Sequence, residues 1–395
     1  MNLSKSFTTT YRDYEVVDCE TTTSNKGHPF DPRNKLVCYA SSLSGFKLHS
    51  DPGFTNVDRH QRDIPLVGFN FKFDCHWLWP NGVPLNPIWD CQLAEHVITG
   101  QKAQYISLDE CLERYGLEKK KDQVKEYWEA GVNTDEIPVP ILQEYQEWDV
   151  RQTGQLFLVQ QDLTDEKQKR LIYLMGEDLK VLHHIEQAGL RFDASAASAY
   201  LSRLREEVAD IEGSLKRFLP VIQHGTFNFD SGDHLSCFLY GGTLTFDYAV
   251  PETSVYKSGP KKGESYTRNR WYEEVVTFEQ RFKPLEGTEL KKTKDETSPT
   301  ITRLYQTDAP TLASLKGGKE GKSILGLLSA RSEKQKLVEM LESIFNLFEK
   351  YQWQDNLIHG QYNQNVAVTG RLSSSAPNMQ NFPPELDRFI ISRYE

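Results

Sequence analysis

The chain has 395 residues, 38% hydrophobic and 26% charged, a composition typical of a soluble globular protein with two or three domains. No segment contains the roughly 20 consecutive apolar residues that a membrane span needs, and residues 1–11 lack the apolar core of a signal peptide. Six irregularly spaced cysteines without a Cys-x-x-Cys pair argue against a zinc ribbon or a disulfide framework, and favour reduced thiols in a cytoplasm.

The formal net charge of −10 is unevenly distributed. Residues 1–163 contain 16 Lys and Arg against 24 Asp and Glu, whereas the rest of the chain contains 30 against 32. This balance does not exclude DNA binding, because only the local groove must be basic. It predicts weak non-specific affinity, and it makes the carboxylates of the first part candidate metal ligands.

Residues 1–163 are predicted to form an α/β domain. Short apolar runs favour strands, and Pro138 and Pro140 stand where a helix can begin without losing a hydrogen bond. That helix is expected to continue through Gln160. The predicted strands are 14–17, 36–40, 45–48 and 65–69.

From about residue 165 the apolar spacing becomes helical. Leu171, Leu174, Leu179, Leu182 and Ile185 form one run, which Gly189 is expected to end. Residues 256–300 are rich in Lys, Glu, Thr, Gly and Pro, and predict an irregular, partly mobile insertion. Further helices are predicted at 194–219, 308–317 and 323–350, the last two separated by a basic turn at 316–322.

Three short motifs point to one chemistry. Asp18 and Glu20 are two apart in a strand, so both carboxylates project to the same side. Residues 70–74 read Asn-Phe-Lys-Phe-Asp and enter a helix, while Tyr145 and Asp149 are four apart within a helix and share a face. Each motif alone is weakly or moderately specific. Their ordered combination, each on the expected element, is a strong signal.

The ordered set resembles the tyrosine-containing subgroup of DEDD exonucleases, which have a ribonuclease-H-like fold. It is most similar to the proofreading domain of family A DNA polymerases of the DNA polymerase I type. The resemblance implies a 3′→5′ exonuclease with two divalent ions, Mg²⁺ or Mn²⁺. Hydrolysis of a phosphodiester builds negative charge that two cations about 4 Å apart stabilise, and carboxylate oxygens suit such hard cations.

The resemblance also implies individual roles for the acidic residues. Asp18, Glu20 and Asp149 would hold the first metal, Asp18 would bridge to the second, and Asp74 would hold the second largely through water. Tyr145 would orient the attacking water, a task that Glu20 shares.

Two neighbouring residues have alternative interpretations. Asn70 either positions the DNA strand or the Asp74 loop, or serves as a helix N-cap. For Asp90, where a strand meets a helix, an N-cap is favoured over a metal ligand.

The second half of the chain resembles the start of the polymerase part of family A enzymes. Residues 186–193 and 227–231 are similar to segments around the first thumb helix, and residues 164–350 are expected to be a mainly α thumb region. A thumb contacts the phosphates of duplex DNA. The residues expected to do so are Lys316, Lys319, Lys322 and Arg331, with a solvated loop as the alternative for the lysines.

Residues 351–395 are expected to be the start of the palm. Thr369-Gly-Arg-Leu-Ser-Ser and Pro377-Asn-Met-Gln-Asn are similar to the stretch that lies along the primer–template duplex in this family. Hydrogen bonds in the minor groove allow contacts that do not depend on sequence. The expected DNA contacts here are Thr369, Arg371, Asn378, Gln380 and Asn381, and the last three have palm elements as alternative partners.

The chain ends before the catalytic carboxylate motifs of palm and fingers, so a second polymerase chain is expected to supply them. The lack of an amino-terminal 5′ nuclease domain is common among phage-encoded members, which would place the protein in a host bacterial cytoplasm. A natural split gene and a piece of a longer polymerase both fit. The alternative functions are a free-standing DNA exonuclease and a non-catalytic DNA-binding assembly subunit.

Overall fold

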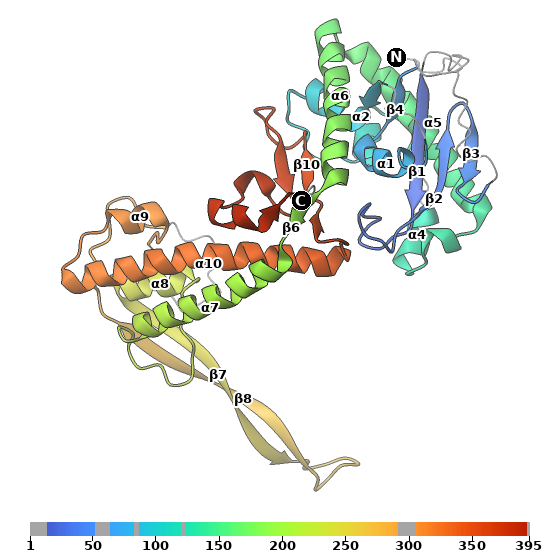
Figure 1. Ribbon diagram of the computed structural model, residues 1–395. Helices are drawn as coiled ribbons and strands as arrows, with labels where there is room; N and C mark the ends of the chain where they lie inside the picture. Colours follow the sequence, from blue (N-terminus) through green and yellow to red (C-terminus); the bar gives the residue numbers. More distant parts are fainter. Residues whose placement is uncertain (1–13, 52–63, 83–86, 120–122, 291–304, 393–395) are drawn as a thin grey trace. The chain divides into compact units, whose positions relative to one another are not determined.

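A computed structural model describes residues 14–51, 64–82, 87–119, 123–290 and 305–392 (Figure 1). The chain forms two compact units. Unit 1 comprises residues 1–197 and 341–395, and unit 2 comprises residues 198–340. This division differs from the predicted boundaries at 163 and 350, because residues 164–197 and the carboxyl-terminal segment pack with the first domain rather than apart from it.

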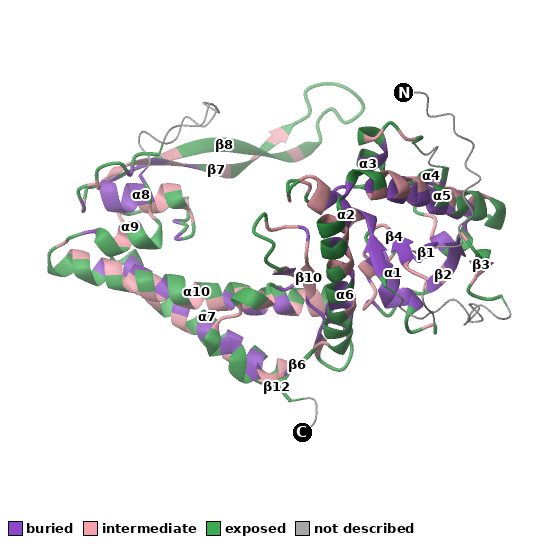
Figure 2. Cartoon of the chain, turned by 90° about the horizontal axis from the view of Figure 1, so that it is seen from above, coloured by how far each residue is buried: buried purple, intermediate pink, exposed green. Residues whose placement is uncertain are grey.

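Unit 1 is built on a five-stranded mixed sheet in the order β3-β2-β1-β4-β5. The central strand β1 is antiparallel to β2 and parallel to β4, which in turn is parallel to β5. Figure 2 shows that buried residues concentrate on these strands. The four predicted strands of this region are confirmed, and their bounds are β1 Glu15–Thr21, β2 Leu36–Ser41, β3 Gly45–Leu48 and β4 Leu66–Gly68. A fifth strand, β5 Ile88–Asp90, ends at the residue where a strand was expected to meet a helix.

Helices pack against this sheet. The long helix α5 begins at Val139, directly after Pro138 and with Pro140 in its first turn, and it contacts β1, β2 and β4. Helix α6 begins with a capping box between Asp165 and Gln168, contacts β5, and ends at Gly189 as predicted. The helices of this part are α1 Phe71–Leu78, α2 Cys91–Ile98, α3 Leu108–Arg114, α4 Gln123–Glu129, α5 Val139–Leu163 and α6 Glu166–Ala188.

The carboxyl-terminal segment completes unit 1 with two small sheets. Strands β12-β6-β9 form one, around the fully buried Phe192, which packs against Phe345, Phe348 and Phe389. Strands β10 and β11 form the other. The bounds are β6 Leu190–Phe192, β9 Leu357–Ile358, β10 Gln361–Asn363, β11 Ser373–Ser375 and β12 Ile390–Ile391.

Unit 2 is mainly helical around an apolar core that includes Phe227, Phe238 and Ile324. Its long helices are most of α7 Ala194–Lys216 and most of α10 Lys319–Tyr351, and the shorter helices are α8 Gly232–Tyr240 and α9 Ala309–Ser314. The helix α10 begins at Lys319, so the predicted basic turn is partly its first helical turn.

The predicted irregular insertion is in part a regular hairpin. Strand β7, Gly242–Val255, pairs antiparallel with β8, Ser265–Phe278, in an unbroken register of cross-strand pairs. The prediction was wrong for 265–278, because strand pairing compensates for the low apolar content of those residues. Residues 291–300, the end of the predicted insertion, lie outside the described residues.

All six cysteines are buried and none forms a disulfide, as the sequence predicts. Among the described helices, none combines the length and the apolar character that crossing a membrane requires.

Candidate active site

Three acidic side chains converge in unit 1. Asp18 and Glu20 lie on β1, and Asp149 lies on α5, which packs against β1. One carboxylate oxygen of each lies within 4.8 Å of those of the other two. A set of carboxylate oxygens is the donor set that Mg²⁺ and Mn²⁺ prefer, so the three residues fit a divalent metal site.

The fourth predicted carboxylate, Asp74 on α1, lies beside this group but outside it. Its Oδ1 atom accepts a hydrogen bond from the backbone N–H of Cys19 at 3.0 Å, between the two acidic residues of β1. Only 3% of Asp74 is exposed. Burial raises the pKa of Asp74 to about 7, although the hydrogen bonds from Cys19 lower it. Without a cation, its negative charge is therefore poorly stabilised.

Helix α5 brings two more side chains to the group. Tyr145 lies one turn before Asp149 and packs edge-on against Trp128, with ring centroids 5.7 Å apart. Gln146 donates a hydrogen bond from Nε2 to Asp18 Oδ2 at 2.8 Å. The sequence analysis missed Gln146, although its position three residues before Asp149 on one helix was a usable signal.

The Gln146 amide has a second feature that bears on the site. Gln146 is fully buried, and its Oε1 atom has no hydrogen-bond partner among the described residues. A buried amide oxygen without a partner is rare in folded proteins. The Oε1 atom of Gln146 could accept a hydrogen bond from a water molecule, free or bound to a cation, among the three carboxylates.

The N-terminus of α1 is held by Asp90 rather than by Asn70. Asp90 accepts backbone N–H groups from Gln92 and Leu93 of α2, which confirms its predicted N-cap role. It also accepts from Asn70 and Phe71, at 3.1 and 2.9 Å. The side chain of Asn70 is exposed and forms no capping hydrogen bond. The N-cap interpretation of the Asn70 side chain was therefore wrong, and a contact with DNA stays a prediction.

The carboxyl-terminal motif exposes its polar groups. Gly370 adopts a positive φ of 72°, which glycine tolerates best. Ser374 donates to the Asn378 side chain at 2.9 Å and accepts from the Gln380 backbone at 3.1 Å, which holds the motif in shape. The predicted DNA contacts that lie exposed are Thr369, Arg371, Asn378, Gln380 and Asn381.

In unit 2 the predicted contacts differ from one another. Lys316, Lys319 and Lys322 are exposed. Arg331 is only 6% exposed, donates to both Asp230 carboxylate oxygens at 2.7 and 2.8 Å, and donates to Glu212 at 2.7 Å. These bonds occupy the guanidinium group. The structure thus gives Arg331 a structural role, and the predicted DNA contact is not supported.

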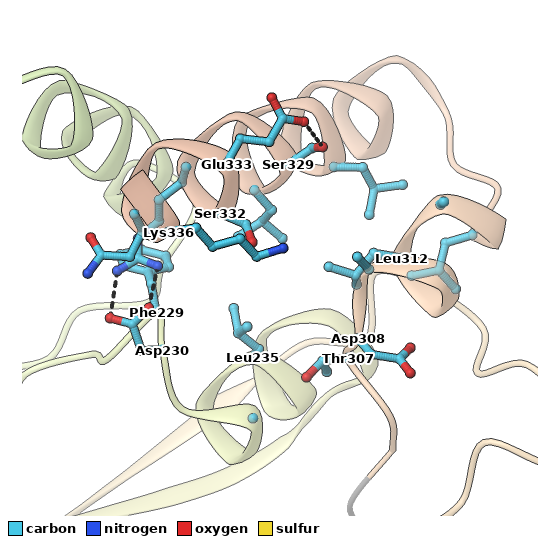
Figure 3. Close-up of a pocket in the computed structure, with 18 of the residues that line it drawn as sticks. Phe229, Asp230, Leu235, Thr307, Asp308, Leu312, Ser329, Ser332, Glu333 and Lys336 are labelled. Carbon is cyan, nitrogen blue, oxygen red and sulfur yellow. Dashed lines mark hydrogen bonds and ion pairs between the residues drawn. The ribbon is translucent and has the colours of Figure 1, made fainter. Parts of the chain in front are cut away.

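A cavity of about 630 Å³ lies beside this ion pair in unit 2. Figure 3 shows it between the helix that carries Ser332 and Lys336 and the segments that carry Leu235 and Leu312. Its lining mixes leucine side chains with the Asp230 carboxylate. We assign no ligand to it, because its polar groups are either exposed or already paired.

Comparison with known proteins finds DNA polymerases among the proteins that this chain resembles. Residues 281–393 match the family model for DNA polymerase family A. Over 332 residues, 82% of the chain, the sequence is 26% identical to DNA polymerase I of Synechocystis sp.. A stretch of 83 residues, 21% of the chain, is 37% identical to DNA polymerase I of Mycobacterium bovis. The chain is thus similar to family A DNA polymerases over residues 281–393, and to a DNA polymerase I over most of its length.

A comparison with solved structures shows a likeness of fold. The POL domain of Pol1 from M. smegmatis, in complex with DNA primer-template and dNTP, shares the fold over 95% of this chain, with a TM-score of 0.62 and 18% identity. The match covers 53% of that chain. The matched segments cover 27% of the Synechocystis protein and 9% of the M. bovis protein.

Proposed function

We propose that the carboxylate group of unit 1 is the 3′→5′ exonuclease site of a proofreading family A DNA polymerase, within a ribonuclease-H-like domain. The observation that carries the proposal is the convergence of Asp18, Glu20 and Asp149 within 4.8 Å. The hydrogen bond from Cys19 to Asp74 places the fourth carboxylate next to them. Four carboxylates in so small a volume repel one another unless cations are bound.

Asp18, Glu20 and Asp149 would hold a divalent cation, and Asp74 would contribute to holding a second one. When bound, two such cations stabilise the negative charge that develops on the attacking and leaving oxygens of a phosphodiester. The hydrogen bond from Gln146 to Oδ2 restrains the orientation of the Asp18 carboxylate. Gln146 is thus a positioning residue in this proposal.

The reaction is hydrolysis of the last phosphodiester at a DNA 3′ end. A water oxygen bonds to phosphorus while the bond from phosphorus to the 3′ oxygen breaks, and the products are a nucleoside 5′-monophosphate and a shortened strand with a 3′ hydroxyl group. Tyr145 and Glu20 would orient the water for attack in line with the leaving oxygen.

The remaining residues would bind DNA for this site and for a polymerase. The exposed side chains of residues 369–381 offer hydrogen-bond donors and acceptors, and Lys316, Lys319 and Lys322 offer positive charge. Unit 2 would correspond to a thumb. Nucleotide incorporation, and a second chain that would supply palm and fingers, stay predictions from the sequence.

The test is digestion of a primer with a mismatched 3′ end by the whole chain with Mg²⁺, and with EDTA as the metal-free control. Asp18→Asn removes a ligand charge at nearly constant size, and we expect at least about a 100-fold loss of rate. The matched control is Asp178→Asn, which changes an exposed aspartate of α6 in the same unit and should leave the rate unchanged.

Two outcomes would contradict the proposal: no digestion by the wild-type chain, or equal rates for Asp18→Asn and wild type. If the wild-type chain binds DNA without digesting it, the assembly-subunit alternative would be favoured. Digestion that is not enhanced by a mismatch would favour a free-standing exonuclease over proofreading.

A further inference from the structure

The β7–β8 hairpin of unit 2 is much longer than its anchoring requires. Its base packs into the core of unit 2 through the buried side chains of Leu244, Phe246, Val276 and Phe278. Beyond this base, the register continues from the pair Tyr248–Tyr272 to the pair Val255–Ser265. At about 3.4 Å per residue this outer part extends about 24 Å. Figures 1 and 2 show it running away from α8, with exposed residues along most of its length.

The outer part of the hairpin is positively charged. Residues 248–272 contain five cations and two carboxylates, on a chain whose net charge is −10. Arg270 forms an ion pair with Glu252 at 3.3 Å. The other cations are exposed and form no ion pair within the part of the chain that the structure describes; they are Lys257, Lys261, Lys262 and Arg268.

The base of the hairpin, residues 242–247 and 273–278, contains three carboxylates and no cation. Glu274 accepts the backbone N–H groups of residues 223–225 at 2.7 to 3.2 Å, so it anchors the hairpin. Asp247 and Glu273 face each other directly across the two strands. A polyanion would be repelled at this base and attracted further out, which defines where a contact begins.

The outer part also has apolar contact groups and free backbone edges. Trp271 is 67% exposed, and the rings of Tyr256 and Tyr266 pack together with centroids 4.5 Å apart near the tip. Among the described residues the sheet has only two strands, so each strand has one edge without a neighbouring strand. Such edges can donate backbone N–H groups to phosphate oxygens.

We propose that the outer part of the β7–β8 hairpin is an arm that binds duplex DNA by entering a groove. A two-stranded ribbon fits the major groove, whose width is about 12 Å. Lysines are depleted at protein–protein interfaces, whereas they supply phosphate contacts on DNA, so the three tip lysines favour DNA over a protein partner. The choice of DNA rests on the proposed function, but the arm is separate from the exonuclease residues.

The test uses the salt dependence of DNA binding. Each lysine that neutralises a phosphate contributes about 0.9 to the slope of log K against log salt concentration. Lys261→Ala/Lys262→Ala removes two charges from the hairpin tip without touching either strand. We expect the slope for a labelled duplex, measured by fluorescence anisotropy in EDTA, to decrease by about 1.8, with a smaller decrease for a single strand of equal length.

The charge-matched control is Lys167→Ala/Arg170→Ala, which removes two exposed cations of α6 and should leave the slope unchanged. A slope for the tip variant equal to that of the control would overturn the proposal, and so would equal decreases for duplex and single strand. Since EDTA prevents metal-dependent digestion, this measurement is independent of the Asp18 experiment. A silent exonuclease with a changed slope would refute the proposed function alone.

Discussion

The two units of the molecule differ in how they bury charge. In unit 1, Glu186 is 2% exposed and accepts hydrogen bonds from Lys72 at 2.6 Å, His76 at 2.8 Å and the Tyr362 backbone at 2.6 Å. Its partners come from α1 and β10, which are far apart in the sequence. Unit 1 therefore depends on complementary charge inside its core as well as on apolar packing.

Unit 2 has the opposite character. Its core is a cluster of aromatic and aliphatic side chains. Its ion pairs lie closer to the surface, as with Lys334 and Glu207, whose side chains are 34% and 39% exposed. Even the buried Arg331 pairs with an aspartate whose side chain is half exposed. The lesson is that equivalent substitutions should have different effects in the two units.

The largest expected difference concerns Glu186. Glu186→Gln leaves Lys72 without its buried carboxylate, so we expect a loss of about 3 kcal/mol in the free energy of unfolding. Glu207→Gln removes an exposed partner of Lys334 and should cause no measurable change. Urea unfolding followed by circular dichroism checks both, and equal effects would refute the contrast.

A smaller change in the free energy of unfolding is expected when the pH is lowered, through His28 of unit 1. Burial is the main cause that lowers the pKa of His28, to about 4. The neighbouring Asp31 raises this pKa, whereas His76, His359 and Lys350 lower it further. Because the unfolded chain takes up a proton near pH 6.5 and the folded chain does not, stability falls as the pH decreases below 6.5. At pH 5 this contributes about 2 kcal/mol of destabilisation.

His28→Asn should remove that contribution and make stability less dependent on pH between 7 and 5. The comparison with wild type is needed because Asp74, with its raised pKa, takes up a proton in the folded state over the same range and acts in the opposite direction. Six of the seven tryptophans belong to unit 1, so fluorescence of a Trp271→Phe background reports on that unit. An unchanged pH dependence would contradict this assignment.

The smallest pair of effects compares two helical glycines. A Cβ atom at Gly176 on α6 would lie 2.3 Å from the backbone oxygen of Ile88, so Gly176→Ala should cost about 2 kcal/mol as the helix shifts from β5. A Cβ atom at Gly213 on α7 would have no other part of the protein within 4 Å, apart from the backbone of its own helix. Gly213→Ala should therefore stabilise the protein by up to about 1 kcal/mol. Thermal unfolding measures both, and the same sign at both positions would rule out the explanation.

The sequence by itself determined the local structure and the chemistry it can support. Alternation along β1 turns Asp18 and Glu20 to one side, and prolines and Gly189 mark where α5 begins and α6 ends. These features depend on neighbours a few residues away, so they can be inferred without knowing the fold.

The tertiary structure decided which groups meet and which are buried. Helix α6 buries Leu179 and Leu182 but exposes Leu171, Leu174 and Ile185 of the same predicted run, because β5 and α2 cover only one of its faces. Arg331 is buried in ion pairs with Asp230 and Glu212, and Gln146 donates a hydrogen bond to Asp18. Residues 265–278 pair with strand β7. Each outcome depends on contacts between distant segments, whose identity the local sequence does not specify.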